Sequence, residues 1–335
     1  MKCKSGGCED LALYSLDVCW EHLSDRDAYK KKLIDLLNNG SDLTGCNLKK
    51  VDLKNAHLEK ARLPKSNLSQ ANLSGAHLFD AKLVNADLVG ADLSRCELAH
   101  CDLRDADLTK SNLQNSRLWN ARLEGANLNE ADLTGSDLWN TCLFNVKLWH
   151  TLFADARSLS MRNFYKTSGL LRDPKINETG AVSAEESYRD LKRYFISNGM
   201  YNDAGWASFR EKVMERLIMK KNRDLRYLPS LLMNFLCGYG ERPSRIVLSS
   251  LLTILLFAFF YLSFNTIESS SGQNVAMNLS DYLYYSTITF TTVGYGDFIP
   301  KPHTFPRLLA AAEAFMGVFL TGLFIFTLAR KYSAR

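Results

Sequence analysis

Residues 81–100 read AKLVN ADLVG ADLSR CELAH, four blocks of five with leucine in the third place of each. The same register continues in both directions, and leucine occupies every fifth position from Leu43 to Leu148, 22 times without interruption. A small or β-branched residue stands two places before each leucine, and the position between them is often Asp or Asn. A period of five fits neither a helix nor a plain strand. The pattern predicts a solenoid that turns a corner every five residues and points both residues inward.

The repeated block closely resembles that of the pentapeptide-repeat family, written A-(D/N)-L-x-x. The resemblance covers residues 41–153 and implies a right-handed quadrilateral β-helix with four pentapeptides in each coil. A strand spacing of ~4.8 Å then gives a rod roughly 25 Å long. In that fold Cys46, Cys96 and Cys101 occupy inward positions and are expected to be small core residues.

The charge of the repeats excludes one class of partner. Some pentapeptide-repeat proteins resemble DNA and bind topoisomerases, which requires a strongly acidic rod. Residues 41–150 hold 14 Asp and Glu against 13 Lys and Arg, and the whole chain carries a formal net charge of +5. This near balance argues against DNA mimicry, and so mild a charge does not predict a nucleic-acid partner.

The N-terminal flank is expected to close the first coil, because solenoids need their open ends covered. A capping helix is predicted over 24–40, with Ser24 as N-cap and Gly40 as the stop. Before it, residues 1–23 contain four metal-binding side chains, and the Cys-x-x-His at the end of the group brings two ligands onto one turn. In a reducing cytosol such a cluster favours Zn²⁺ over disulfides, the alternative being unconnected thiols at a frayed terminus. The predicted ligands are Cys3, Cys8, Cys19 and His22.

The C-terminal flank is predicted to be a helical linker over 154–244, after Leu152 and Phe153 break the repeat. Apolar stripes over 184–198 and 203–221 indicate two helices joined by a short turn, an αα-hairpin. The apolar segment 228–237 is too short to span a bilayer. We expect it to lie at the membrane interface.

One outward face of the predicted β-helix is rich in aromatic residues, because residues 20 apart lie one coil apart on the same side. Three exposed aromatics in a row are unusual on a solvated face. We hypothesise that this face packs on the helical hairpin or on a neighbouring subunit. His57 and His77 stack similarly and are expected to be solvated. The aromatic ladder consists of Phe79, Ala99, Trp119 and Trp139.

Two apolar segments near the C-terminus predict membrane spans. Residues 246–264 form a 19-residue run without a charge. The second apolar stretch, 308–328, contains a single charged residue, Glu313. Each is close to the ~20 residues that a spanning helix needs. Both have their basic flanks on the side of the repeats. By the positive-inside rule this predicts a multi-pass protein of the plasma (inner) membrane with cytoplasmic termini and a cytosolic β-helix.

Between the two spans, a short helical stretch at 279–291 precedes the sequence TVGYGD at 292–297. This sequence is identified as a potassium-channel selectivity filter, in which four loops point backbone carbonyls at a dehydrated K⁺ ion. Glycine supplies the backbone angles that other residues resist. The resemblance implies that Thr292 adds a ring of hydroxyls at the inner end of the filter. Val293 and Tyr295 then face outward and pack against the pore helix, and Asp297 concentrates cations at the external mouth. The residues are Thr292, Val293, Gly294, Tyr295, Gly296 and Asp297.

Residues 245–335 as a whole resemble the two-transmembrane, one-pore bacterial potassium-channel module. The resemblance implies a homotetramer in a lipid bilayer, an all-α pore domain with K⁺ as the permeant ion, and no enzymatic activity. Gly317 then occupies the position of the family's hinge glycine. Val318, Thr321 and Ile325 are hypothesised to line the inner cavity. Glu313 is an intramembrane carboxylate, interpreted as a buried group behind the filter, with direct ion contact as the alternative.

The role of the repeats stays open at this point. They either gate the pore through the linker or serve assembly and localisation, with an unidentified cytosolic protein or ligand as partner. The alternative function for the chain is a membrane-tethered scaffold whose pore does not conduct.

Overall fold

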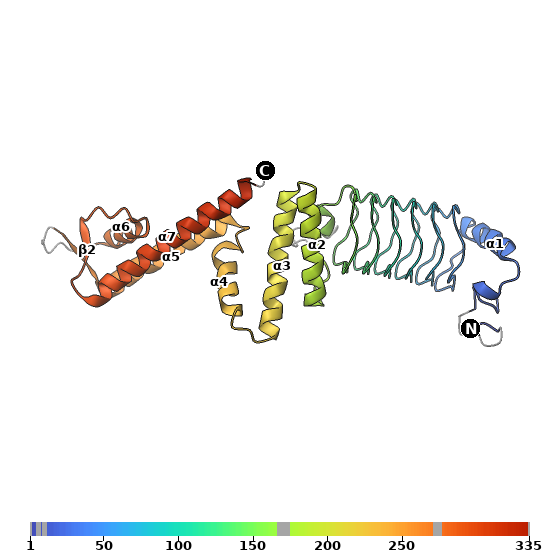
Figure 1. Cartoon of the computed structure of the whole chain (residues 1–335), viewed down its shortest axis with the longest axis horizontal. Helices are drawn as coiled ribbons and strands as arrows, with labels where there is room; N and C mark the ends of the chain where they lie inside the picture. Colours follow the sequence, from blue (N-terminus) through green and yellow to red (C-terminus); the bar gives the residue numbers. More distant parts are fainter. Residues whose placement is uncertain (1, 5–7, 9–11, 166–174, 271–276, 334–335) are drawn as a thin grey trace. The chain divides into compact units, whose positions relative to one another are not determined.

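The computed structural model describes residues 2–4, 8, 12–165, 175–270 and 277–333. The chain divides into two compact units, Met1–Ile218 and Met219–Arg335 (Figure 1). We describe each unit by itself.

The repeats of the first unit form a β-helix with four pentapeptides in each coil. Parallel bridges join residues 20 positions apart from Asp42↔Arg62 to Asp137↔Arg157, and each coil donates backbone hydrogen bonds to the next, as Leu88 N does to Asp107 O at 2.7 Å. The leucine and the small residue of each block face inward, and most of the leucines are fully buried. These observations confirm the predicted period and its inward positions.

The corners of the coils use left-handed backbone, mostly without glycine. The last residue of most blocks has a positive φ, for example 57° at Asn85 and 59° at Lys110, with Gly90 at 65°. Lysine and asparagine therefore serve at corners where the side chain points outward.

The β-helix extends further than the sequence predicts. Phe153 takes the register position of the leucines and is 6% exposed, and Ala156 fills the small-residue position beside it. The bridge Asp137↔Arg157 completes this side. The predicted break at Leu152 and Phe153 is therefore wrong, because Phe153 fills the leucine position and its ring packs against that of Tyr194, with centroids 6.2 Å apart.

The N-terminal end is closed by a 3-10 turn η1, Trp20–His22, and by helix α1, Arg26–Asn38. Tyr29, Leu33 and Leu37 of α1 are buried in the same core as the repeats. The helix is capped by Asp25, whose carboxylate accepts from Ala28 N at 2.9 Å, so the prediction of Ser24 as N-cap is wrong by one residue.

The other end is closed by η2, Met161–Phe164, and by the hairpin of α2, Ala181–Ser197, and α3, Tyr201–Lys221. The predicted αα-hairpin is confirmed, although both helices begin earlier than expected. Tyr194 Oη donates to Ala156 O at 2.8 Å, and Trp149 Nε1 donates to Glu186 at 2.5 Å. Figure 1 shows the coils stacked between α1 and α2.

The hairpin covers the end of the β-helix and leaves its aromatic face open. Phe79, Trp119 and Trp139 are 42%, 40% and 56% exposed. The hypothesis that this face packs on the hairpin is therefore wrong, because the hairpin is needed to bury the last coil. Packing on another subunit remains a prediction.

The second unit consists of α4, Tyr227–Cys237, α5, Pro243–Phe264, α6, Leu279–Phe290, and α7, Thr304–Ser333. Helices α5 and α7 run side by side and α6 packs on both. α5 and the Thr304–Ala329 part of α7 have mean hydropathies of 2.3 and 2.0, are long enough to cross a membrane, and are largely exposed in one chain.

The sequence does not predict a two-stranded antiparallel sheet that joins the chain before α6 to the chain after residues 292–297, which we call the filter segment. β1, Ile267–Ser269, pairs with β2, Phe298–Pro300, in the register Ile267↔Pro300. The sheet ties the end of α5 to the chain that leaves the filter segment.

Candidate functional site

The filter segment begins at the C-terminal end of α6. That helix starts with a reciprocal cap between Asn278 and Asp281 and ends at Phe290. The chain then folds back on the helix, since Val293 N donates to Ile288 O at 2.9 Å. The short helix therefore sets where the filter segment starts.

The backbone of the filter segment has the angles for which glycine is needed. Gly294 and Gly296 have φ of 52° and 77°, in the left-handed region that side-chain-bearing residues resist. Thr292 also lies there, at 57°, where its hydroxyl donates to Thr291 O at 2.7 Å.

The outer end of the filter segment is held by the two-stranded sheet. Ser270 N donates to Asp297 O at 3.0 Å, and Lys301 N donates to Thr266 O at 2.9 Å. The ring of Tyr284 on α6 meets that of Phe298 edge to face, with centroids 6.0 Å apart. Asp297 thus follows the glycines at a backbone position anchored by β1 and β2.

The outward side chains of the filter segment find no cover within one chain. Val293 is 52% exposed and Tyr295 is 73% exposed, and the packing of these side chains against the pore helix stays a prediction. The four residues of α7 singled out by sequence divide into two groups. Val318, Thr321 and Ile325 are exposed, whereas Gly317 is buried.

Gly317 has a packing role that the sequence did not reveal. A Cβ at this position would lie 1.9 Å from Phe290 O and 2.8 Å from Phe290 C, so only glycine allows α7 to approach the end of α6 so closely. Gly322, the second glycine of the helix, has nothing within 4 Å of such a Cβ. The structure thus assigns Gly317 to the contact with the pore helix, and its hinge role stays a prediction.

Glu313 is fully buried one turn before Gly317. Its carboxyl accepts from Tyr261 Oη of α5 at 2.6 Å and from Ser286 Oγ of α6. These contacts confirm the interpretation of a buried group that satisfies local donors.

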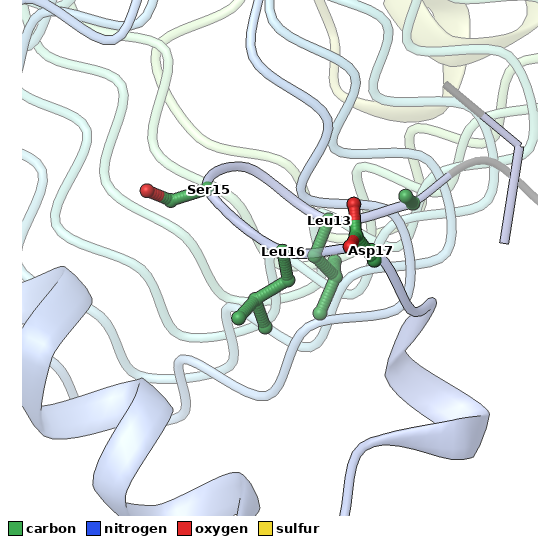
Figure 2. A pocket seen from close by; sticks show the side chains of 5 residues that line it. Leu13, Ser15, Leu16 and Asp17 are labelled. Carbon is green, nitrogen blue, oxygen red and sulfur yellow. The ribbon is translucent and has the colours of Figure 1, made fainter. Parts of the chain in front are cut away.

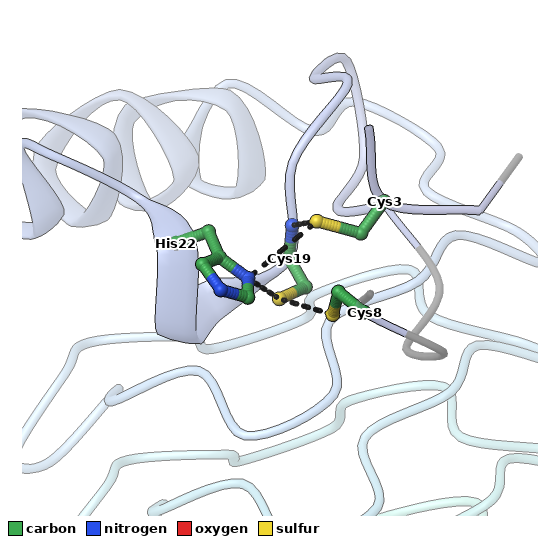
Figure 3. A group of neighbouring side chains, drawn as sticks. All are labelled: Cys3, Cys8, Cys19 and His22. Atoms are coloured by element: carbon green, nitrogen blue, oxygen red, sulfur yellow. Dashed lines mark hydrogen bonds between the residues drawn. The ribbon is translucent and has the colours of Figure 1, made fainter. Parts of the chain in front are cut away.

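The N-terminal cysteine cluster comes together around one point, as Figure 3 shows. The four ligand atoms all lie within 4.8 Å of one another, including Cys8 Sγ to Cys19 Sγ at 3.7 Å and Cys19 Sγ to His22 Nδ1 at 3.2 Å. The backbone N–H of Cys19 also points at Cys3 Sγ, at 3.3 Å. The cluster is able to hold a metal ion.

The electrostatics of this cluster differ from those of the core cysteines. Burial alone would raise the pKa of the Cys19 thiol, but hydrogen bonds with His22 and Cys8 bring that pKa below its usual value. Hydrogen bonds with Cys19 and Cys3 raise the pKa of His22. By contrast, burial raises the pKa of three thiols in the repeats to about 12, as expected for inert core residues. They are Cys46, Cys96 and Cys101.

Two other features of the first unit are weaker candidates for a functional site. His57 and His77 stack with ring centroids 4.7 Å apart and with Glu59 form a second group of possible ligands, but all three are exposed. Figure 2 shows a hollow lined by one loop, including Leu13, Leu16 and Asp17. Asp17 forms an exposed ion pair with Lys4 at 2.7 Å, and the hollow lies far in sequence from residues 292–297.

Comparisons with known proteins agree with both halves of this description. A family model described as "Ion channel" matches residues 249–334, and one described as "Pentapeptide repeats (8 copies)" matches 41–80, 71–109 and 111–149.

Among curated proteins, the chain is 38% identical over 84 residues to two pore potassium channel a of Oryza sativa subsp. japonica. It is 35% identical over 91 residues to two-pore potassium channel 1 of Arabidopsis thaliana. These alignments cover 25% and 24% of this chain, and the chain spans about a quarter (24%) of the length of each relative.

Among solved structures, HetL of the cyanobacterium Nostoc sp. strain PCC 7120, a pentapeptide repeat protein, is 28% identical with a TM-score of 0.25. The match covers 35% of this chain and 62% of that one. QnrB1, a plasmid-mediated fluoroquinolone resistance protein, is 17% identical with a TM-score of 0.25 over 35% of this chain and 68% of that one.

The chain therefore combines a pentapeptide repeat region with an ion-channel pore domain, and neither kind of domain is enzymatic. The pore domain is distantly similar to two-pore potassium channels. Its two candidate spans indicate a membrane protein.

Proposed function

We propose that this protein is a K⁺-selective channel that conducts passively across the plasma membrane as a homotetramer, with both termini in the cytoplasm. The observation that carries the proposal is the segment at 292–297, which follows the C-terminal end of α6 between two candidate spans and has φ of 52° and 77° at its glycines. Backbone carbonyls of four such segments would replace the hydration shell of K⁺.

Fourfold assembly is supported by what one chain leaves uncovered. Val293 and Tyr295 are exposed beside the filter backbone, and Val318 and Ile325 are each 61% exposed on α7. A single chain also supplies only one of the four carbonyl columns that an ion needs. Neighbouring copies would cover the filter side chains and complete the ion path.

The test is the reversal potential of the purified protein in a planar bilayer under a K⁺/Na⁺ gradient. We expect reversal near the K⁺ equilibrium potential, and Gly296→Ala should remove this selectivity because its φ disfavours a side chain. Gly199→Ala is the matched control, since Gly199 has a similar φ of 70° in the α2–α3 turn and lies outside the pore unit. A current without preference for K⁺ contradicts the proposal, and silence under all conditions favours the non-conducting scaffold.

We also propose that the N-terminal cluster binds Zn²⁺ as a structural ion. Three thiols and one imidazole suit tetrahedral Zn²⁺, and a short segment of this size gains little from burial alone. Elemental analysis of the full chain should find about one zinc per chain and almost none in Cys19→Ser. Cys46→Ala is the control, because Cys46 is a core thiol, and equal zinc in Cys19→Ser and the unmodified chain would contradict the site.

The repeats are proposed to act on the pore through the segment 184–243 or to serve assembly. A chain lacking residues 1–180 separates these roles. Selective current with altered open probability supports gating, whereas loss of tetramers in detergent supports assembly.

A further inference from the structure

One polar cluster inside the second unit links all three helices around the filter segment. Glu313 of α7, Tyr261 of α5 and Ser286 of α6 are each 0% exposed. Glu313 accepts from Tyr261 Oη at 2.6 Å and from Ser286 Oγ. In the described part of the chain, no basic side chain pairs with Glu313.

The cluster also reaches the backbone of the first span. Ser286 Oγ lies 2.8 Å from Ile254 O as well as next to Glu313, and a serine has a single proton to donate. When the carboxyl is ionised, both hydroxyls donate to it. When it is protonated, it can donate to Ser286, which then donates to Ile254 O. Both arrangements leave the three helices joined.

A second contact between α6 and α7 lies one helical turn from the first. Phe290 follows Ser286 by four residues, and Gly317 follows Glu313 by four residues. The backbone at Phe290 lies so close to Gly317 that a Cβ there would be 1.9 Å from Phe290 O. The filter segment begins immediately after this second contact, and its Val293 N bonds to Ile288 O between the two.

We propose that Glu313 is a positioning residue for the filter: with Tyr261 and Ser286 it fixes the filter-bearing helix to both candidate spans. The carboxyl does not touch the ion path. It sets where α6 ends, and this determines where the carbonyls of the filter lie. This inference rests on the proposed function, because its effect would be measured as a change in ion selectivity.

The test uses the full-length tetramer and substitutions that remove single groups. Tyr261→Phe and Ser286→Ala each remove one hydroxyl, and Glu313→Leu removes the acceptor. Each should lower the K⁺/Na⁺ permeability ratio by about tenfold, because each leaves a buried polar partner unsatisfied. Glu313→Gln keeps an acceptor for Tyr261 and a donor for Ser286, and should stay within about twofold of the unmodified ratio.

Thr327→Val is the matched control. Thr327 is also 0% exposed on α7, and its hydroxyl has no partner among the described residues. It should leave the permeability ratio unchanged. Unmodified ratios in Tyr261→Phe and Ser286→Ala overturn the proposal, as does a Glu313→Gln ratio as low as that of Glu313→Leu. If Glu313→Leu does not assemble, the two hydroxyl variants decide.

A second measurement separates this inference from the proposed function. If the unmodified protein itself shows no selective current, the proposed function fails. Hydrogen exchange of peptides covering 279–290 then tests the link alone. Exchange should be faster in Ser286→Ala and Glu313→Leu than in the unmodified chain and in Thr327→Val, and equal exchange overturns the proposal.

Discussion

The β-helix and the pore unit bury their apolar residues in opposite ways. In the repeats, Leu88 and Leu108 are fully buried by the coils above and below them. In the pore unit, Phe315 is 73% exposed and Phe259 is 60% exposed in one chain. The first unit therefore completes its core within a single chain, whereas the second leaves surfaces suited to lipid and to other copies. A repeat protein gains stability layer by layer, whereas the exposed apolar surface of the pore unit is what the proposed assembly of four copies would cover.

The two units also use left-handed backbone differently. At the corners of the β-helix, Lys110 and Asn85 adopt φ near 60° with their side chains outside. In the pore unit, the filter segment adopts it at Gly294 and Gly296 and also at Thr292. The repeats therefore use this backbone region mostly at residues whose side chains point outward, whereas the filter segment combines two glycines with one threonine.

The largest effect on stability is expected at Gly317, where α7 lies against the backbone of α6. Gly317→Ala places a methyl group against the backbone of Phe290, and backbone cannot yield as a side chain does. We expect a cost above the ~1–3 kcal/mol of ordinary overpacking in each chain, with loss of the proposed selective current and a lower melting temperature of the protein. Gly322→Ala, which meets nothing within 4 Å, should behave like the unmodified chain. Similar behaviour of the two variants would show that α6 and α7 do not pack this closely.

The next largest effect on stability is expected when a buried leucine, and not an exposed one, is replaced by alanine. Leu108→Ala empties a fully buried site between coils and should lower the free energy of unfolding of the β-helix by about 2–5 kcal/mol. Leu255→Ala, at a position 56% exposed on α5, should cost less. Denaturant unfolding of the full chain, followed by tryptophan fluorescence, measures the first; the five tryptophans all lie within residues 20–206. Equal losses in a melting curve of the whole protein would remove the contrast between the units.

A smaller effect is expected at the N-terminal end of the β-helix. Asp25→Ala removes the carboxylate that accepts from Ala28 N and should cost about 1 kcal/mol. Ser24→Ala should cost almost nothing, because Ser24 does not cap the helix. Thermal unfolding monitored by circular dichroism distinguishes the two variants. A larger loss of stability in Ser24→Ala would show that Ser24 caps the helix, as the sequence predicted.

The smallest effect on folding is expected on the aromatic face. Trp119→Ala with Trp139→Ala removes side chains that are 40% and 56% exposed and should change the free energy of unfolding by no more than about 0.5 kcal/mol for each site. Any effect should fall on assembly, measured by the mass of the complex in detergent. A large loss of folding stability would mean that this face is covered within one chain.

Sequence predicted the β-helix, the two spans and the filter segment, because each has a local or periodic pattern. In the repeats, residues 20 apart become neighbours in every coil, so one short motif encodes both the fold and its core. The cluster of three cysteines and one histidine was also predictable, since its members lie within 20 residues of one another in the sequence. The continuation of the repeat through residue 157 was missed because Phe153 departs from leucine while keeping its register position.

The tertiary structure alone decided how the pore segment is held. Sequence suggested a hinge at Gly317 but not the contact with Phe290, gave no signal for the pairing of β1 with β2, and named no partner for Glu313. Its partners Ser286 and Tyr261 lie 27 and 52 positions away, at spacings that nothing in the chain repeats. Such contacts depend on how three helices meet, so no local pattern of residues reveals them.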